Sequence, residues 1–361
     1  MLRNLHLLRA FAALSVVYFH ITSTAGLNLA WDIGSRGVDV FFVISGFIIA
    51  WIGAKQPGQF FVRRLIRIVP FYWAATLVVF AAAIVLPQLF RSTDASLPHL
   101  LASLFFVPHL SSSGETQPTL ILGWSLNFEM YFYALFALAL LVSARWAPLL
   151  CAIPIVAWVL IAHAVGPIST AADFYARPTS LEFCYGIGAY YLVAWCERHK
   201  PRLEGNAALR AGLVLTLIAG VATIVCFEKQ YRDALPRYLV AGLPAFVIVV
   251  AALLLERLHG IASRSRLAYL LGEASYVIYL IHPYIAFGIL RLCVRHPERL
   301  SSPAIVAIVL GLMILIAAVG IAIHLLFEKP VMRALRARFA PDPAREATAP
   351  HPASSRLPTS T

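Results

Sequence analysis

Charged residues are scarce in this sequence: only 13% of its 361 residues are Asp, Glu, Lys or Arg, against about 25% in a typical soluble domain. The scarcity excludes a water-soluble globular fold, and with it a nucleic-acid-binding module or a soluble dinucleotide-binding enzyme. The five cysteines form no CxxC pair and have no metal-ligand spacing, so a disulfide scaffold is excluded as well. We therefore expect no nucleic-acid partner, no metal and no bound cofactor.

Hydrophobic residues are abundant instead, at 60% of the chain, and apolar runs of about twenty residues recur along it. We expect an all-α polytopic membrane protein with about ten transmembrane helices and a single membrane domain over residues 1–335. A proline-rich segment with few apolar residues follows at 336–361, and we expect it to be a disordered cytoplasmic tail. The predicted spans are residues 5–25, 37–54, 69–88, 121–142, 147–165, 178–196, 209–227, 237–255, 268–291 and 303–326.

The excess of basic residues gives a net charge of +12. In a membrane protein we interpret this excess first as a signal of membrane topology and only then as a sign of an anionic partner. An even number of spans puts both termini on one side of the membrane. The connections on that side hold 20 of the 29 Lys and Arg residues and the remaining connections hold 9. Because basic residues accumulate in cytoplasmic loops, we expect both termini in the cytoplasm.

Ionisable side chains at membrane depth are the main functional signal, since each costs on the order of 3 kcal/mol in hydrocarbon. Arg9 and His20 are eleven residues apart in the first span. That separation is about three helical turns, so both side chains lie on one face of the helix, roughly 16 Å apart in height. A lone buried histidine is more often a packing residue, but the shared face favours a functional pair.

Three more ionisable residues fall in the outer half of predicted spans. Asp39 either orients an imidazole or is a first-turn acid stabilised by the helix dipole. Glu129 lies in an apolar helix and needs a proton or a partner, which a catalytic role or a structural hydrogen bond would supply. His282 precedes Pro283, which should kink the helix and free a carbonyl; by position alone, a site role and a packing role are equally supported.

Arg63, Arg64 and Arg67 lie in a loop just before Pro70, where the third span is expected to begin. Arginine binds phosphate through a planar fork, so the cluster suits a nucleotide-bearing ligand such as coenzyme A. Ordinary positive-inside signalling is the alternative explanation. With Arg9 at similar depth, these residues predict a layer of cations beneath a layer of titratable groups. An anionic donor would bind below and a polar acceptor would be activated above.

Six sequence motifs occur in order along the chain, from about residue 3 to 335. They are Arg9-x10-His20, GVDVFFVISGF, RRLIRIVPFY, WSLNFEMYFY, SYVIYLIHPY and FEKP. In these motifs the chain resembles the acyltransferase 3 family of polytopic membrane O-acyltransferases, most closely its exopolysaccharide-modifying, ExoZ-like branch.

The resemblance implies transfer of an acyl group, commonly acetyl, from cytoplasmic acyl-CoA as co-substrate to a hydroxyl of a glycan or lipid-linked oligosaccharide. The location would be a bacterial cytoplasmic membrane, with membrane lipid and polysaccharide-assembly proteins as further partners. On the matching positions it makes His20 the leading catalytic residue and Arg9 its partner. It also makes Arg63, Arg64 and Arg67 donor-binding residues and Glu129 a site carboxylate, and it leaves the role of His282 open.

We expect His20 to act as general base on a sugar hydroxyl, with Asp39 or Glu129 fixing its tautomer. A covalent acyl-histidine intermediate is a variant of the same chemistry. A transporter or flippase of a lipid-linked glycan is the main alternative, because it too needs a polar path between the helices. A membrane acyltransferase of another fold, using a histidine in a different span, is a second alternative.

Overall fold

The computed structural model describes residues 2–24, 34–53, 57–88, 90, 93–112, 114–231, 235–293 and 300–341, and within these ranges the chain is helical without a strand. This confirms the predicted all-α fold class. The long helices are α1 (Arg3–Thr24), α2 (Gly37–Gly53), α3 (Phe60–Val85), α5 (Trp124–Val142), α6 (Ala147–Val165), α8 (Leu181–Arg198), α10 (Ala207–Tyr231), α11 (Leu243–His259), α12 (Arg266–Cys293) and α13 (Ser302–Ile323). The shorter helices are α4 (Leu97–Leu104), α7 (Thr170–Tyr175), α9 (Lys200–Leu203) and α14 (Lys329–Phe339).

Each predicted span coincides with one of the long helices. In the described part of the chain, eight helices are long and apolar enough to cross a membrane: α1, α3, α5, α6, α10, α11, α12 and α13. The remaining two predicted spans form α2, which has 17 residues, and α8, which carries three charged side chains among its 18 residues. The chain is therefore a multi-pass membrane protein, and the count of ten stays a prediction.

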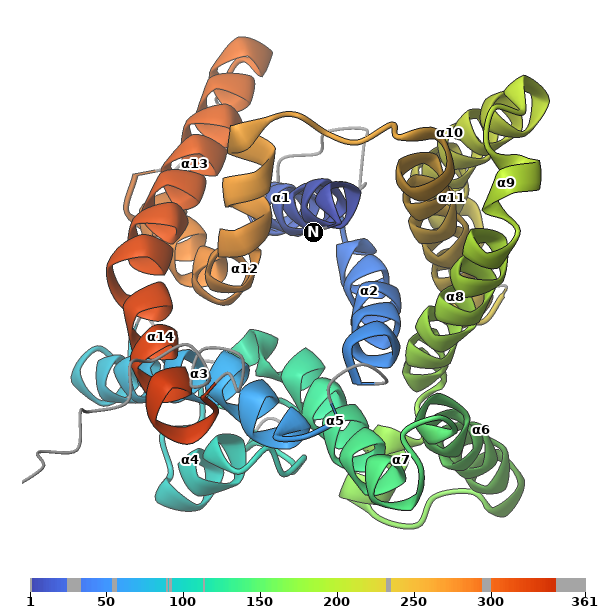
Figure 1. Ribbon diagram of the computed structural model, residues 1–361. Coiled ribbons are helices and arrows are strands. Elements are labelled where there is room, and N and C mark those ends of the chain that lie inside the picture. The colour runs from blue at the N-terminus through green and yellow to red at the C-terminus, as the bar shows by residue number, and fades with distance from the viewer. Residues whose placement is uncertain are drawn as a thin grey trace, which may run out of the picture.

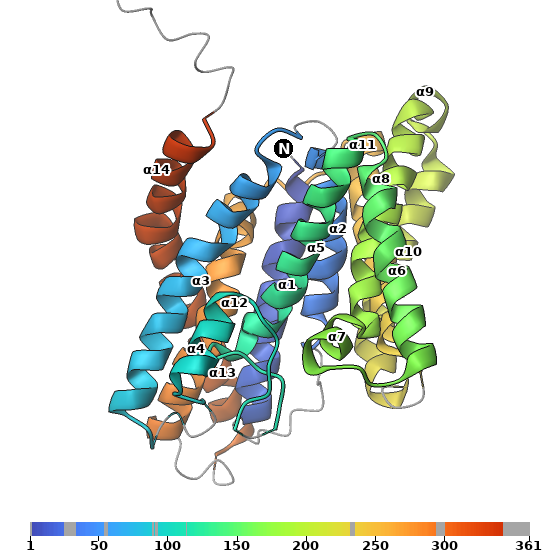
Figure 2. The same cartoon turned by 90° about the horizontal axis from the view of Figure 1, so that it is seen from below.

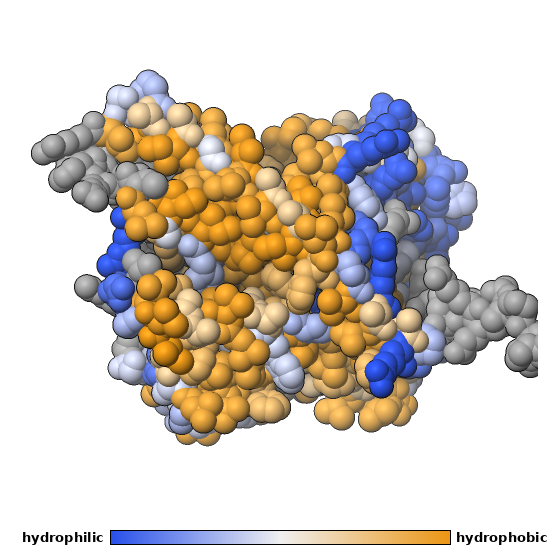
Figure 3. Space-filling model, turned by 90° about the vertical axis from the view of Figure 1, so that its left-hand side faces the viewer, coloured by the Kyte–Doolittle hydropathy of each residue, from blue (hydrophilic) through white to orange (hydrophobic). Residues whose placement is uncertain are grey.

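The outer surface of the bundle is apolar. On α13, Leu310 and Ile314 are 54% and 69% exposed, and Leu326 just beyond it is 80% exposed. Figure 3 shows this face as a broad hydrophobic area with the hydrophilic residues gathered at one edge. Exposed apolar area on this scale is stable in lipid and costly in water.

Close helix contacts in the bundle depend on glycine. A Cβ atom at Gly272 of α12 would lie 2.3 Å from the backbone oxygen of His6 in α1. Gly46 of α2 and Gly186 of α8 face each other in the same way, since a Cβ on either would lie 2.2 Å from a carbonyl of the partner helix. Small residues let membrane helices approach closely, and Gly46, Gly186 and Gly272 have this packing role here.

The third helix begins earlier than predicted. It starts at Phe60 rather than at residue 69, and Pro70 lies inside it. A proline within a membrane helix removes one backbone donor, but neighbouring helices can compensate for the loss. Arg63, Arg64 and Arg67 are consequently in the first turns of α3, and their predicted placement in a loop is wrong. A helix fixes the direction of each guanidinium group, which a loop would not.

The start of α1 and α14 lie at the same end of the bundle (Figure 2). A π-helical turn over His324–Glu328 joins α13 to α14. Helix α14 ends at Phe339, beyond the predicted start of the tail at 336, and the tail from residue 342 onward lies outside the described residues. The cytoplasmic location of this end stays a prediction.

At the opposite end, residues 93–112 and 114–120, which we call the cap, pack on the bundle (Figure 2). The Tyr72 hydroxyl donates to the Ser103 carbonyl at 3.0 Å. His99 is buried, and one imidazole N–H joins its Nδ1 to Nε2 of His109 across 2.8 Å. Burial first, and then the neighbouring His109, lower the pKa of His99, while the nearby Asp94 carboxylate acts in the opposite direction.

Candidate active site

A cavity of about 90 Å³ lies in the middle of the bundle, between α1, α2, α3, α5 and α12. These helices surround the centre of the view in Figure 1. The charged residues that line the cavity are Arg9, Arg64, Arg67 and Glu129. Four of the eight predicted site residues are therefore brought together, from three different helices, around one cavity.

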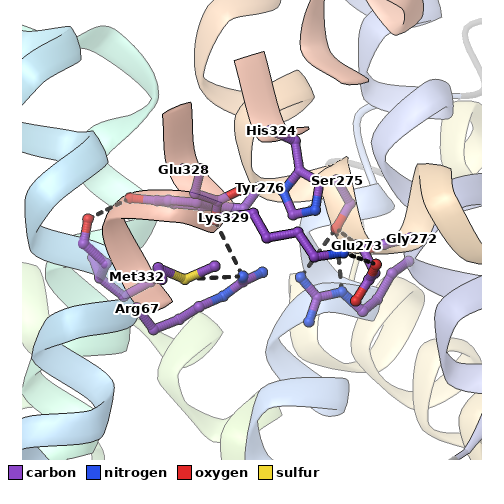
Figure 4. A network of polar contacts seen from close by, with 11 residues as sticks. Arg67, Gly272, Glu273, Ser275, Tyr276, His324, Glu328, Lys329 and Met332 are labelled. Carbon is purple, nitrogen blue, oxygen red and sulfur yellow. Dashed lines mark hydrogen bonds and ion pairs between the residues drawn. The ribbon is translucent and has the colours of Figure 1, made fainter. Parts of the chain in front are cut away.

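Arg9 is held against α12. Its Nε and Nη2 atoms donate to Ser275 Oγ at 3.2 and 3.0 Å, and Ser275 Oγ donates to the Gly272 carbonyl at 2.8 Å. The hydroxyl can reach because α1 and α12 approach closely at Gly272. The contact fixes a half-buried guanidinium group at the cavity wall, and Figure 4 shows Ser275 and Gly272 in this position.

Glu129 has two hydroxyl partners. Ser45 Oγ donates to its Oε1 atom at 3.0 Å, and the hydroxyl of Tyr133, one helical turn further along α5, donates to the same oxygen. The Arg64 guanidinium lies 5.9 Å from the centre of the Tyr133 ring. Glu129 thus has the partner that it was expected to need, in the form of two hydroxyl groups beside a cation-rich cavity.

Arg67 belongs to a second network at the wall of the cavity (Figure 4). Its Nη1 atom donates to Glu328 Oε1 at 3.1 Å, and His324 Nδ1 donates to the other oxygen of Glu328 at 2.5 Å. Lys329 pairs with Glu273 of α12 at 3.4 Å. The π-helical turn places His324 and Glu328 together, and such turns often occur at functional sites.

The two candidate histidines meet further along α1 and α12. The centres of the His20 and His282 rings are 5.1 Å apart. His282 is fully buried, and its Nδ1 atom donates to the Tyr279 carbonyl at 2.8 Å. Pro283 lacks the N–H that would otherwise occupy this carbonyl four residues earlier, which confirms that a carbonyl is freed. The hydrogen bond keeps the proton on Nδ1 and leaves Nε2 as an acceptor.

The cavity does not extend to the histidines. Tyr279 lines it, and its ring centre is 6.0 Å from that of Phe41 and 6.1 Å from that of His282. The Tyr279 hydroxyl is also fixed by Ser125 Oγ at 2.9 Å. Tyr279 thus lies between the cavity and His282 in this conformation, and a passage from the arginines to the histidines stays a prediction. The predicted site residues that do not line the cavity are His20, Asp39, Arg63 and His282.

Asp39 does not partner an imidazole. Both of its oxygens accept from Arg237, each at 2.8 Å, and the Asp39 side chain is fully buried. A bidentate pair of this kind gives both oxygens of the carboxylate a charged partner. The suggestion that Asp39 orients His20 is therefore corrected: Asp39 anchors the residue that precedes the π-helical turn Tyr238–Gly242.

Sequence reasoning missed the hydroxyl groups of the site, namely Ser45, Tyr133 and Ser275, and it missed Arg237. The contact of Tyr133 with Glu129 could have been predicted, because residues four apart in a helix are neighbours and Glu129 required a donor. The other three contact residues more than 80 positions away in the chain. Nothing in their local sequence indicates those contacts.

Buried cations, a carboxylate and a histidine pair between apolar helices define an integral membrane protein with polar chemistry at its centre. Ionisable residues at such depth mark a functional site, but enzymes and carriers both have them. The comparison with known families separates the two. The family described as "Acyltransferase domain", acyltransferase 3, matches residues 2–323. The chain belongs to this family, as its motifs predicted, and it is an acyltransferase.

The relatives include proteins of several kinds. The exopolysaccharide production protein ExoZ of Rhizobium meliloti is 36% identical over 89% of this chain and 96% of its own length. The acyltransferase MdmB of Streptomyces mycarofaciens is 27% identical, over 94% of this chain and 95% of its own. The peptidoglycan O-acetyltransferase OatA of Listeria monocytogenes is 27% identical over 76% of this chain, which spans about half (48%) of that relative. No solved structure matches the chain.

Proposed function

We propose that the protein transfers an acyl group, in the first instance acetyl, from cytoplasmic acyl-CoA to a hydroxyl of an exopolysaccharide or another cell-surface glycan. The observation that carries the proposal is the division of α1 into two functional ends. Arg9 lines the arginine-rich cavity, and His20, eleven residues further along α1, contacts His282. The similarity to ExoZ supports a polysaccharide as acceptor, and the similarity to OatA supports acetyl as the acyl group.

The cavity supplies the donor side of the proposal. Arg9, Arg64 and Arg67 present three guanidinium groups to a space that contains one carboxylate, Glu129. Arginine is the residue best suited to hold phosphates in a planar, directional contact. The phosphates of acyl-CoA would bind at this end, and the pantetheine arm would direct the thioester along α1 toward His20.

The histidine pair supplies the proton transfer. The acceptor hydroxyl gives its proton to His20 as its oxygen attacks the thioester carbonyl carbon. The carbon–sulfur bond then breaks, and the coenzyme A thiolate takes up a proton. The unprotonated Nε2 of His282, beside His20, stabilises the imidazolium that forms. General base catalysis of this kind contributes about 10²- to 10⁴-fold. Transfer through an acyl group on His20 is the two-step form of the same proposal.

Tyr279 and the Phe41 ring packed against it must move for either form to occur, because Tyr279 lines the cavity and contacts the His282 ring. A rotation of these two side chains is a smaller change than a rearrangement of helices.

The test uses the full chain purified in detergent, with labelled acetyl-CoA and oligosaccharides from the surface polysaccharide. Labelled, esterified oligosaccharide and release of the coenzyme A thiol are the expected products. His20→Ala should lower turnover at least a hundredfold. His163→Ala, which removes an exposed histidine at the end of α6, should not change it. Acceptor movement across vesicles without acylation would instead identify a carrier, and full activity of His20→Ala would remove His20 from the mechanism.

A further inference from the structure

Helix α14 brings another arginine to the cluster on α3. Met332 of α14 contacts the Arg67 guanidinium, with 3.7 Å between its sulfur and Nη1. Arg336 is one helical turn beyond Met332 and therefore lies on the same face of α14. It is within electrostatic range of the guanidinium groups of Arg67, Arg64 and Arg63. The first turns of α3 and the end of α14 thus form a surface with four guanidinium groups.

Among the residues that the structure describes, positive charge outweighs negative charge around Arg336: three guanidinium groups act on it, against one carboxylate. The carboxylate within electrostatic range of Arg336 is that of Glu328, and its two oxygens already accept from Arg67 and His324. Clustered like charges repel one another and destabilise the folded state unless an anion is bound. The Nε atom of Arg64 is moreover buried without a hydrogen-bond partner among the described residues. The cluster is therefore suited to a ligand with several phosphates.

The four arginines are arranged from the cavity outward. Arg64 and Arg67 line the cavity, whereas Arg63 is outside its lining and Arg336 is exposed on α14. The groups of an acyl-CoA molecule follow one another in a matching order. The thioester is at one end, the diphosphate follows, and the 3′-phosphate on the ribose is near the other end. If the thioester points along α1 toward His20 and the diphosphate lies at Arg64 and Arg67, the 3′-phosphate lies on the exposed side of the cluster.

We propose, on the basis of the proposed function, that Arg336 binds the 3′-phosphate of the acyl-CoA donor and makes the enzyme select coenzyme A over dephospho-coenzyme A. Arg336 is then a donor-specificity residue contributed by the last helix of the bundle. The phosphate of an anionic lipid headgroup has the same charge chemistry, so the experiment must distinguish these two sources of phosphate.

The experiment measures equilibrium binding of coenzyme A and of dephospho-coenzyme A to the full chain in an uncharged detergent without phospholipid. Wild-type protein should bind coenzyme A about tenfold more tightly, the effect of one charge-assisted contact at a partly exposed site. Arg336→Gln should bind both ligands equally and at the weaker level. Arg338→Gln is the matched control: it removes the same charge from the same helix, but its guanidinium lies over the ring of Phe339.

The outcomes separate this inference from the proposed function. Loss of discrimination in Arg336→Gln alone supports the inference, even if no acyl transfer is detected and the proposed function falls. Equal effects of Arg336→Gln and Arg338→Gln, or unchanged discrimination in Arg336→Gln, overturn it. A difference between Arg336→Gln and wild type that occurs only with anionic vesicles, and not with the two ligands, assigns Arg336 to lipid headgroups and also overturns it.

Discussion

Pro283 allows the structural and chemical roles of His282 to be separated by mutation. His282 Nδ1 occupies the Tyr279 carbonyl that proline leaves without a backbone donor. His282→Leu removes the donor while keeping most of the side-chain volume. A buried carbonyl left unpaired costs about 1–3 kcal/mol, so this variant should unfold several degrees below wild type. It should also lose acyl transfer, because the acceptor nitrogen beside His20 is gone.

Adding Pro283→Ala to this variant returns an N–H to position 283, one turn above the Tyr279 carbonyl. The helix then closes its own hydrogen bond, and removal of an interior proline is worth about 3 kcal/mol in a regular helix. We therefore expect His282→Leu/Pro283→Ala to unfold at or above the wild-type temperature and still to lack acyl transfer. Thermal unfolding in detergent and release of the coenzyme A thiol from acetyl-CoA measure the two quantities separately.

Recovery of transfer together with stability would refute this reasoning. In that case His282 would only repair the helix, and Nε2 would have no part in the proton transfer. The single variant Pro283→Ala is the control for the backbone: because a carbonyl oxygen has two lone pairs, it can accept from residue 283 and from His282 together. This variant should keep the activity of wild type.

The remaining predictions concern the cavity and the cap. Glu129→Gln keeps an oxygen acceptor for Ser45 and Tyr133 but removes the negative charge among half-buried guanidinium groups, which should cost about 1 kcal/mol of stability; an unfolding temperature equal to that of wild type would contradict it. The lowered pKa of His99 means that the folded chain resists a proton which the unfolded chain accepts near pH 6.5. Stability should therefore fall as pH drops from 7.5 to 5.5, by less in His99→Gln, and thermal unfolding at both pH values checks this.

The fold could be predicted from the sequence because hydrocarbon imposes a simple length rule. Each apolar run of about twenty residues became a helix, and the ends were wrong where the rule stops applying. Helix α3 begins nine residues before the predicted start. The prediction missed these residues because three of them are arginines, which interrupt the apolar run. Apolar length detects only the part of a helix that lies in lipid. The polar turns beyond it depend on partners such as Glu328, which come from elsewhere in the chain.

The relative placement of site residues on one helix could be predicted from the sequence, whereas contacts between residues of different helices mostly could not. The spacing of Arg9 and His20 predicted a shared face, and both side chains indeed contact α12, at Ser275 and His282. The partner of Asp39 was not predictable, because Arg237 is 198 positions away and reaches it only through the packing of two helices. Depth in the membrane follows from the sequence, whereas rotation and crossing of helices do not.

A rigid helix between Arg9 and His20 has a consequence for donor selection under the proposed function. Eleven residues at 1.5 Å each fix the two ends roughly 16 Å apart, and every acyl-CoA has the same arm between its phosphates and its thioester. The thioester therefore stops at the same height whatever acyl group it carries. The acyl group itself extends beyond that height, toward the ring of Phe287, whose centre is 6.4 Å from that of His20. Selection of the acyl group must then arise around the histidine pair, and the arginines contribute only to holding the carrier.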